Sequence, residues 1–145
     1  MSVEFIQKLP TPAEIKMQFP LPARLAEIKA EKDKEISRIF TGESDKFLVI
    51  IGPCSADNED AVLDYTTRLA KVQEKVADRL LLIPRVYTNK PRTTGLGYKG
   101  MLHQPDPEKQ PSVSEGLHAI RHMHMRVLAE TGFSTPSIFN IRCAW

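Results

Sequence analysis

Two short runs of apolar residues stand out along the chain. Residues 47–51, Phe-Leu-Val-Ile-Ile, are followed by Gly52 and Pro53, and residues 80–83, Leu-Leu-Leu-Ile, lead into Pro84. An unbroken apolar run of this length is typical of a strand buried on both faces, as in a parallel sheet. Pro84 has no backbone N–H, so we expect it at an edge of the ladder or at a bulge.

Three other segments carry apolar residues at a spacing of three and four, which is typical of an amphipathic helix. They are residues 23–40, residues 59–77, and the segment that runs from Ser112 to a stop at Gly132. Gly42 can end the first helix. The charged stretch in the middle of that helix, Lys-Ala-Glu-Lys-Asp-Lys-Glu, predicts that much of it faces water.

Residues that can accept hydrogen bonds from free backbone N–H groups precede two of these helices. Asp57 or Asn58 can cap the second helix, and residues 112–115, Ser-Val-Ser-Glu, form a capping-box pattern before the third. Residues 1–22 contain four prolines, which favour an extended, turn-rich arm. The order of arm, helix, strand, helix, strand, long loop and helix predicts an α/β fold with parallel strands.

The composition is that of one globular domain. The chain has 145 residues, of which 41% are hydrophobic and 26% charged, and its formal net charge is +2. So small a charge, without a block of Lys and Arg, argues against nucleic acid as a partner. No apolar run approaches the roughly 20 residues of a membrane span, and the first residues show no secretory pattern. Cys54 and Cys143 suit a reducing compartment, so we expect a cytoplasmic protein.

Candidate chemistry gathers in residues 90–100, Lys-Pro-Arg-Thr-Thr-Gly-Leu-Gly-Tyr-Lys-Gly, whose last six residues spell G-x-G-x-x-G. A dinucleotide fingerprint directly follows a strand and opens a helix. Here the glycines follow a basic loop, and three prolines occur in the next twelve residues. We therefore favour glycines that give a loop its unusual dihedral angles over a dinucleotide site.

The cations of this region lie where a ligand site is expected. Arg85 lies at the carboxyl end of the second predicted strand, with Lys90 and Arg92 shortly after it. Ligands bind at the carboxyl ends of strands in open α/β sheets and in barrels. Arg offers a planar fork of donors and Lys a compact charge, while Thr93 and Thr94 add neutral donors. The alternatives are a site for a small phosphorylated or carboxylated ligand and a solvated basic turn.

Other reactive side chains leave their roles open. Cys54 follows the carboxyl end of the first predicted strand. A thiol at this position can act as a nucleophile, bind a metal or simply pack in the core. His118 and His122 stand four residues apart on a predicted helix, a spacing that permits metal binding. His124 falls elsewhere on the helical wheel, and no H-E-x-x-H pattern occurs, so a solvated helix face is the favoured interpretation.

Residues 51–55, Ile-Gly-Pro-Cys-Ser, and residues 85–100, which contain Arg-Val-Tyr and Lys-Pro-Arg-Thr-Thr, together resemble the class I 3-deoxy-D-arabino-heptulosonate 7-phosphate (DAHP) synthases. The resemblance extends from about Leu9 through Thr131. It implies a (β/α)8 barrel, the TIM-barrel fold. The implied reaction is a metal-dependent condensation of phosphoenolpyruvate with erythrose 4-phosphate that releases phosphate. This transferase reaction is the first step of the shikimate pathway, which leads to the aromatic amino acids.

The resemblance also implies roles for individual residues. Cys54 falls on a metal-ligating position, and the complete enzyme uses a divalent ion of the Mn, Fe, Co or Zn class. Arg85 and Lys90 fall on phosphoenolpyruvate-binding positions, and Lys90 is also a candidate proton donor. Arg92 and Thr93 fall on positions that hold erythrose 4-phosphate. The family further implies a homo-oligomer and an aromatic amino acid as effector, with the N-terminal arm involved in both.

The resemblance divides the chain into three parts. Residues 1–45 are the N-terminal arm and helix, residues 46–135 are the first βα units of the barrel, and residues 136–145 are an aberrant tail. The tail has no acidic residue and does not match the family, although its apolar content suits a third strand.

A (β/α)8 barrel takes about 250 residues, and the family's other metal ligands, a His, a Glu and an Asp, lie on later strands. We therefore expect an incomplete barrel, produced by a frameshift or premature stop near Thr135. As an isolated chain it would be inactive and would not hold the metal stably. The alternatives are a non-catalytic module that binds a phosphorylated ligand and a module that interacts with a synthase.

Overall fold

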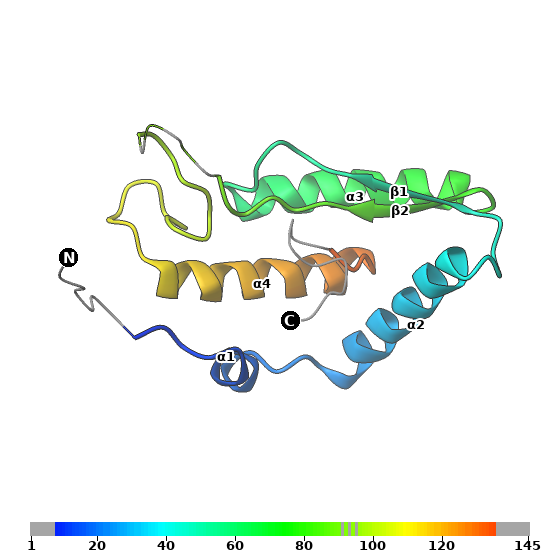
Figure 1. Cartoon of the computed structure of the whole chain (residues 1–145), viewed down its shortest axis with the longest axis horizontal. Helices are drawn as coiled ribbons and strands as arrows, with labels where there is room; N and C mark the ends of the chain where they lie inside the picture. The colour runs from blue at the N-terminus through cyan, green and yellow to red at the C-terminus, as the bar shows by residue number, and fades with distance from the viewer. Residues whose placement is uncertain (1–7, 91, 93, 95, 136–145) are drawn as a thin grey trace.

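The computed structural model describes residues 8–90, 92, 94 and 96–135. Two helices are followed by strand, helix, strand and helix along this part of the chain (Figure 1). In chain order they are α1 (Pro12–Gln18), α2 (Ala23–Phe40), β1 (Phe47–Ile51), α3 (Glu59–Val76), β2 (Leu80–Pro84) and α4 (Val113–Thr131). The predicted α/β organisation is therefore confirmed for the described residues. The proposed strand in residues 136–145 lies outside them.

The two strands form a parallel pair joined through α3, which is the predicted arrangement. The register runs from Phe47 opposite Leu80 to Ile51 opposite Pro84. On the far edge of β2, the Gln73 side chain of α3 accepts a hydrogen bond from Leu82 N at 2.6 Å and donates one to Leu80 O at 2.9 Å. Because backbone N–H groups alternate in direction along a strand, Pro84 shares the outward direction of Leu82. Proline therefore ends β2 without removing a bond to β1.

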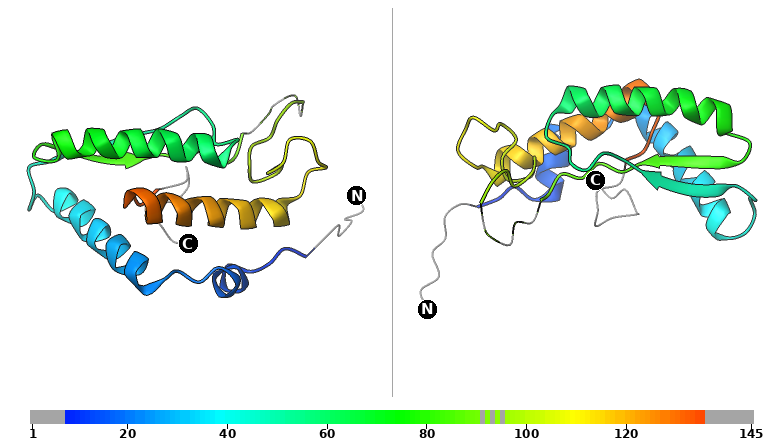
Figure 2. Two further views of the ribbon diagram at one scale, coloured as in Figure 1. Left: turned by 180° about the vertical axis from the view of Figure 1, so that it is seen from behind. Right: turned by 90° about the horizontal axis from the view of Figure 1, so that it is seen from above.

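The core lies between the sheet and the pair α3 and α4, which run side by side in both views of Figure 2. Helix α2 contacts both β1 and α4. Among the described residues, no helix is long and apolar enough to cross a membrane. The buried cluster comprises Ala56, Val62, Leu82, Val86, Met101, Met123, Val127 and Phe133.

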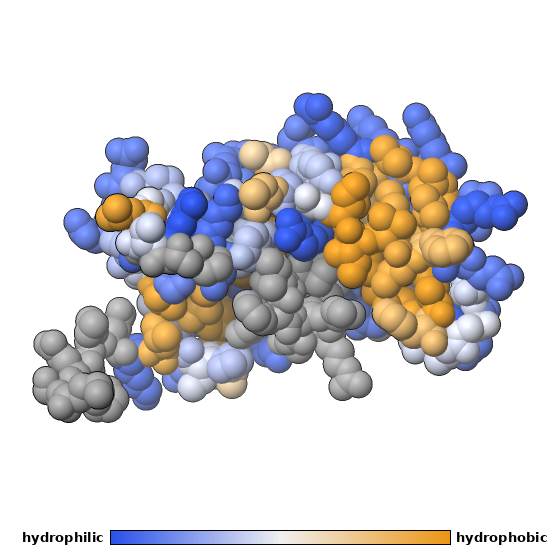
Figure 3. Space-filling view, turned by 45° about the horizontal axis from the view of Figure 1, so that its top comes forward, coloured by the Kyte–Doolittle hydropathy of each residue, from blue (hydrophilic) through white to orange (hydrophobic). Residues whose placement is uncertain are grey.

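The prediction that the apolar run 47–51 is buried on both faces is wrong for β1, whereas most of β2 is buried. Residues 81–84 are buried, whereas Phe47 is 75% exposed, Ile50 is 47% exposed and Ile51 is 44% exposed. Helix α3 packs against β2, and α4 packs against α3. Within the described residues no strand pairs with the outer edge of β1. Figure 3 shows a broad apolar patch on the side of the molecule where the strands lie.

The expectation of an extended N-terminal arm is also incorrect in part, because residues 12–18 form a short helix. The Thr11 side chain accepts a hydrogen bond from Glu14 N at 3.3 Å, and Thr11 N donates to a Glu14 carboxylate oxygen at 2.6 Å. Pro12 stands at the first helical position, where its missing N–H costs nothing. Burial of Ile15 attaches this helix to the rest of the protein.

The other predicted helix limits agree closely with the structure. Asn58 caps α3 by accepting from Ala61 N at 2.9 Å, and Ser112 caps α4 by accepting from Glu115 N at 3.3 Å. Helix α4 ends at Gly132, whose φ of 71° lies in the left-handed region that glycine adopts without strain. The predicted range 59–77 is one residue longer than α3.

Candidate functional site

The segment after β1 lies against the residues that follow β2, at the carboxyl ends of both strands. Arg85 N donates to Ile51 O at 2.8 Å, and the Arg85 guanidinium Nη2 donates to Pro53 O at 3.0 Å. Gly52 makes this approach possible, because a Cβ at that position would overlap the carbonyl group of Arg85. The sequence motif Ile-Gly-Pro-Cys-Ser is thus held in place by the arginine that the sequence analysis singled out.

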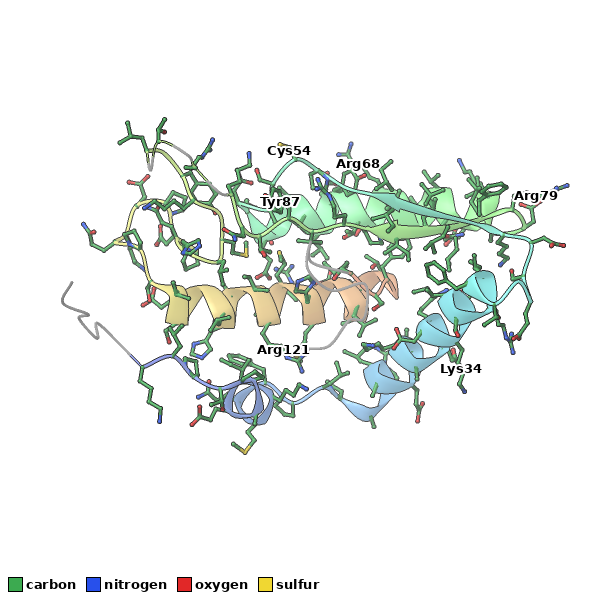
Figure 4. The ribbon with its side chains drawn as sticks, viewed as in Figure 1. Lys34, Cys54, Arg68, Arg79, Tyr87 and Arg121 are labelled. Carbon is green, nitrogen blue, oxygen red and sulfur yellow. The ribbon has the colours of Figure 1, made fainter. Side chains whose placement is uncertain are left out.

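Cys54 is exposed on this turn. Two residues later, Ala56 N donates to Tyr87 O at 2.8 Å, so the turn is attached to the second strand's extension on both sides of the thiol. Figure 4 shows Cys54 and Tyr87 close to one another in the view, and Arg79 well away from them at one end of the molecule. Across the described residues, no group of three or more His, Cys, Asp or Glu side chains is arranged to hold a metal.

The two ends of the basic loop are joined by backbone hydrogen bonds, which place Lys90 beside Lys99. Lys90 N donates to Lys99 O at 2.9 Å, and Leu102 N donates to Thr88 O at 2.9 Å. The Arg92 Nε donates to Tyr98 O at 3.0 Å, which leaves the outer guanidinium nitrogens available to a ligand.

Gly100 is required at the base of this loop. Its φ of 93° is left-handed, and a Cβ there would lie 2.5 Å from Thr88 O. The next helix begins only at Val113, so the glycines do not open a helix as a dinucleotide fingerprint does.

The cations of the site are not neutralised by carboxylates. Within the described ranges, no ion pair involves Arg85, Lys90, Arg92 or Lys99. Arg85 also lies over the Tyr87 ring, 5.3 Å from its centroid. A group of unpaired cations with free donors is suited to a phosphorylated or carboxylated ligand. Thr93, the neutral donor that the sequence analysis added, lies outside the described residues.

Tyr98 is a residue of the site that the sequence analysis missed. Its hydroxyl is buried and has no hydrogen-bond partner among the described residues. Burial raises the pKa of this phenol, and the charge of Asp57 raises it further. Tyr98 therefore stays protonated near pH 7. An aromatic residue between two cationic positions was the available sequence signal.

The histidines of α4 have structural surroundings. His122 Nδ1 lies 3.0 Å from a Glu59 carboxylate oxygen, and Arg126 contacts the other oxygen of Glu59 at 2.5 Å. The His118 ring packs against Phe19, with 5.6 Å between the ring centroids. His118 and His122 thus have separate neighbours on different elements, and the structure does not bring them together with a third metal ligand in the described residues.

Comparison with known proteins identifies the relatives of this chain. The family model described as the DAHP synthetase I family matches residues 22–139. The match extends past Thr135 and includes residues 136–139, the first four of the predicted aberrant tail. The division of the chain into three parts stays a prediction.

Several curated relatives support the same family. The Trp-sensitive phospho-2-dehydro-3-deoxyheptonate aldolase of Escherichia coli K12 is 35% identical over 134 residues, which cover 92% of this chain and 38% of the relative. The phenylalanine-inhibited enzyme of Saccharomyces cerevisiae is 35% identical over 120 residues, which cover 83% of this chain and 32% of the relative. An enzyme of the same name from Amycolatopsis methanolica is 36% identical over 124 residues, covering 86% of this chain and 61% of the relative.

A solved structure has the same fold over nearly the whole chain. The phospho-2-dehydro-3-deoxyheptonate aldolase of Francisella tularensis SCHU S4 superposes with a TM-score of 0.82 at 28% identity, covering 94% of this chain and 39% of that one. This chain therefore spans well under half the length of most of the relatives described here. By the family match and by its relatives, the chain belongs to the DAHP synthetase I family.

Proposed function

We propose that this chain carries the phosphoenolpyruvate-binding part of a DAHP synthase, which condenses phosphoenolpyruvate with erythrose 4-phosphate at the start of the shikimate pathway. The observation that carries the proposal is the group of unpaired cations at the carboxyl ends of β1 and β2. The family match and the names of the relatives support it. A cytoplasmic location is part of the proposal, because an exposed thiol such as Cys54 persists in a reducing compartment.

The proposed roles follow from the donors that each side chain presents. Arg85 and Lys90 bind the carboxylate and phosphate of phosphoenolpyruvate, and Lys90 supplies a proton during the condensation. Arg92 and Thr93 bind the phosphate of erythrose 4-phosphate. Guanidinium and ammonium groups placed in advance around two anionic substrates reduce their mutual repulsion and orient them for reaction.

The described residues do not fit a complete metal site. Cys54 is exposed on a turn and is the one candidate ligand that the resemblance assigns, whereas catalytic metals usually have about three protein ligands. The expected behaviour of the isolated 145-residue protein is binding of phosphoenolpyruvate without turnover.

A ligand titration tests the binding. Phosphoenolpyruvate should raise the melting temperature of the protein, because a ligand that binds the folded state stabilises it. Lys90→Ala should abolish the rise, and Lys71→Ala, which removes an exposed lysine of α3, should leave it intact. An unchanged rise in Lys90→Ala would refute the assigned site. Phosphate release from phosphoenolpyruvate in the presence of erythrose 4-phosphate would refute the expected lack of turnover.

A second candidate function is a module that interacts with a synthase. The exposed side chains of Phe47, Ile50 and Ile51 favour it, because an apolar strand with an open edge is suited to pair with another chain. A homo-oligomer would bury the same surface. If the protein fails to co-purify with a full-length synthase expressed in the same cell, this second function is excluded.

A further inference from the structure

The outer edge of β1 carries backbone groups that no strand among the described residues meets. Phe47 N and Ile51 O form hydrogen bonds on the β2 side, at 2.9 and 2.8 Å, so these residues turn their backbone groups towards β2. Because the direction alternates along a strand, the N–H and C=O groups of Leu48 and Ile50 point away from β2. The sheet of the described residues consists of β1 and β2, so these groups lie at an open edge.

The side chains around this edge are apolar and uncharged. Phe47, Ile50 and Ile51 are exposed, and Figure 3 shows the apolar patch on this side of the molecule. The strand itself contains no charged residue. Lys46, which directly precedes it, is paired with Glu35 at 3.1 Å. Open backbone groups, exposed apolar side chains and no unpaired charge make this edge a favourable surface for another strand.

The edge is complementary to itself. When two copies of β1 lie antiparallel about a two-fold axis at Val49, Leu48 of each copy stands opposite Ile50 of the other. Each of these pairs exchanges both of its N–H to C=O hydrogen bonds, so the outward groups of Leu48 and Ile50 are all satisfied. A parallel pair of identical strands cannot have this symmetry, because a residue that points at the partner then lies opposite one that points away.

The same register places the side chains favourably. Phe47 of one copy lies opposite Ile51 of the other, at a position between hydrogen-bonded pairs where side chains approach closely. An aromatic ring opposite a β-branched side chain is a stabilising cross-strand pair. Lys46 lies opposite Gly52, so no like charges face one another across the axis.

We propose that β1 pairs with β1 of a second copy of this chain, antiparallel and centred on Val49, to form a continuous sheet in the order β2, β1, β1, β2. The second copy is the favoured partner because the edge satisfies its own hydrogen-bonding groups, whereas any other partner has to supply an unrelated strand. This inference rests on the second candidate function and names its partner. The surface is β1, and not the N-terminal arm to which the resemblance attributes assembly.

Disulfide trapping of the 145-residue protein tests the register. Cys54→Ser and Cys143→Ser remove the native thiols, and Phe47→Cys and Ile51→Cys are then introduced separately into that background. An equal mixture of the two proteins should give at least about tenfold more disulfide-linked dimer than either protein alone. Opposite residues of an antiparallel pair have Cα atoms about 4.5–5.5 Å apart, within reach of a disulfide. Residue 47 of one copy and residue 47 of the other are separated by roughly 13 Å along the strands, which is too far.

Met17→Cys in the same background is the control for chance collisions, because Met17 is exposed on α1. It should form no more linked dimer than Phe47→Cys does alone. A mixture that links no better than the single proteins or Met17→Cys, or that does not link at all, would overturn the proposal.

Sedimentation equilibrium tests the same contact without cysteines. Ile50→Pro removes an outward N–H and leaves the hydrogen bonds to β2 in place, so it should convert the wild-type dimer to monomer while the circular dichroism spectrum stays native. A dimer that persists in natively folded Ile50→Pro would place the contact elsewhere and overturn the proposal. If Ile50→Pro does not fold, the cysteine mixture decides alone.

Two further measurements separate this inference from the proposed function. If the cysteine mixture stays unlinked while the protein co-purifies with a full-length synthase, the partner is the synthase and self-pairing falls. Phosphoenolpyruvate is titrated separately into the wild-type protein. If it fails to raise the melting temperature while the mixture links, self-pairing stands and the proposed phosphoenolpyruvate site falls. If it raises the melting temperature and the mixture does not link, self-pairing alone falls.

Discussion

At the scale of single residues, Gly52 decides whether the proposed site can form. Any side chain there would overlap the carbonyl group of Arg85, and that backbone cannot move without breaking its bond to Ile51. Gly52→Ala should therefore lower the free energy of unfolding by about 3 kcal/mol, as expected for a steric clash in a packed region. Urea denaturation measures the loss.

Gly42→Ala is the matched control for this change. Gly42 has a φ of 77° and open space around its Cβ position, so its replacement costs only the backbone strain of about 1 kcal/mol. Equal losses in the two variants would show that the close approach of Gly52 to Arg85 is not what the site requires.

A second single residue, His124, should make stability depend on pH. Its folded-state pKa of about 4 lies below the ordinary value of 6.5, because of burial and the neighbouring charge of Arg121. The unfolded chain then binds more protons between these values, so stability is full above pH 6.5, falls as the pH drops towards 4, and levels off below. The total loss amounts to about 3 kcal/mol.

Unfolding free energies measured from pH 7 to pH 4 test this dependence. His124→Asn should remove most of the slope between pH 6.5 and 4. His122→Gln, at an exposed histidine paired with Glu59, should retain it. A slope that persists in His124→Asn would assign the proton uptake to another group.

The sequence predicted where the charged residues of the site lie better than it predicted which side chains are buried beside them. The positions of Arg85, Lys90 and Arg92 at the carboxyl end of β2 were predictable because parallel strands place their ends together. The buried hydroxyl of Tyr98 was not, because its burial depends on how the loop folds back. The same limit applies to Arg121, whose neighbour Phe19 is 102 residues away in the chain.

At the scale of elements, Gln73 of α3 takes the place of a neighbouring strand at the edge of β2. It forms one hydrogen bond as donor and one as acceptor with the strand backbone. Gln73→Met keeps the side chain's volume and removes both bonds, so it should lower the free energy of unfolding by about 2 kcal/mol. Hydrogen exchange at Leu82 should accelerate as well.

Glu74→Met, at the next and exposed position of α3, is the control for Gln73→Met. It introduces the same side chain without touching β2, so it should leave both the stability and the exchange at Leu82 near wild type. If the two variants behave alike, the contact between Gln73 and β2 contributes nothing measurable.

Element limits could be predicted where a local signal was strong. The range of α2 and the end of α4 at Gly132 followed from periodicity and from glycine's conformational freedom. Helix α1 was missed because four prolines in 22 residues suggested an extended chain, although Thr11, Pro12 and Glu14 form a capping box with proline at its most favourable position. The local capping box therefore favoured a helix more strongly than the proline content favoured an extended chain.

At the scale of the whole molecule, the discrepancy at β1 is the most informative one. Its five apolar residues indicate a strand with neighbours on both sides, and that pattern reflects the complete fold. The described residues supply only β2 as a neighbour, and the chain covers 39% of the structure that it superposes on. The sequence pattern therefore predicted the strand correctly and its burial incorrectly, since burial depends on which elements pack against the strand.

The exposed surface of β1 should make the protein self-associate as its concentration rises. Phe47, Ile50 and Ile51 present apolar side chains beside an open strand edge, and β1 contains none of the lysines or prolines that protect such edges. Ile50→Lys introduces a charge into this surface and should shift the sedimentation profile towards monomer at every concentration. Met17→Lys, at a comparably exposed apolar site on α1, should sediment as the wild type does. A wild-type protein that stays monomeric throughout, or an equal shift in both variants, would show that β1 is not the contact surface.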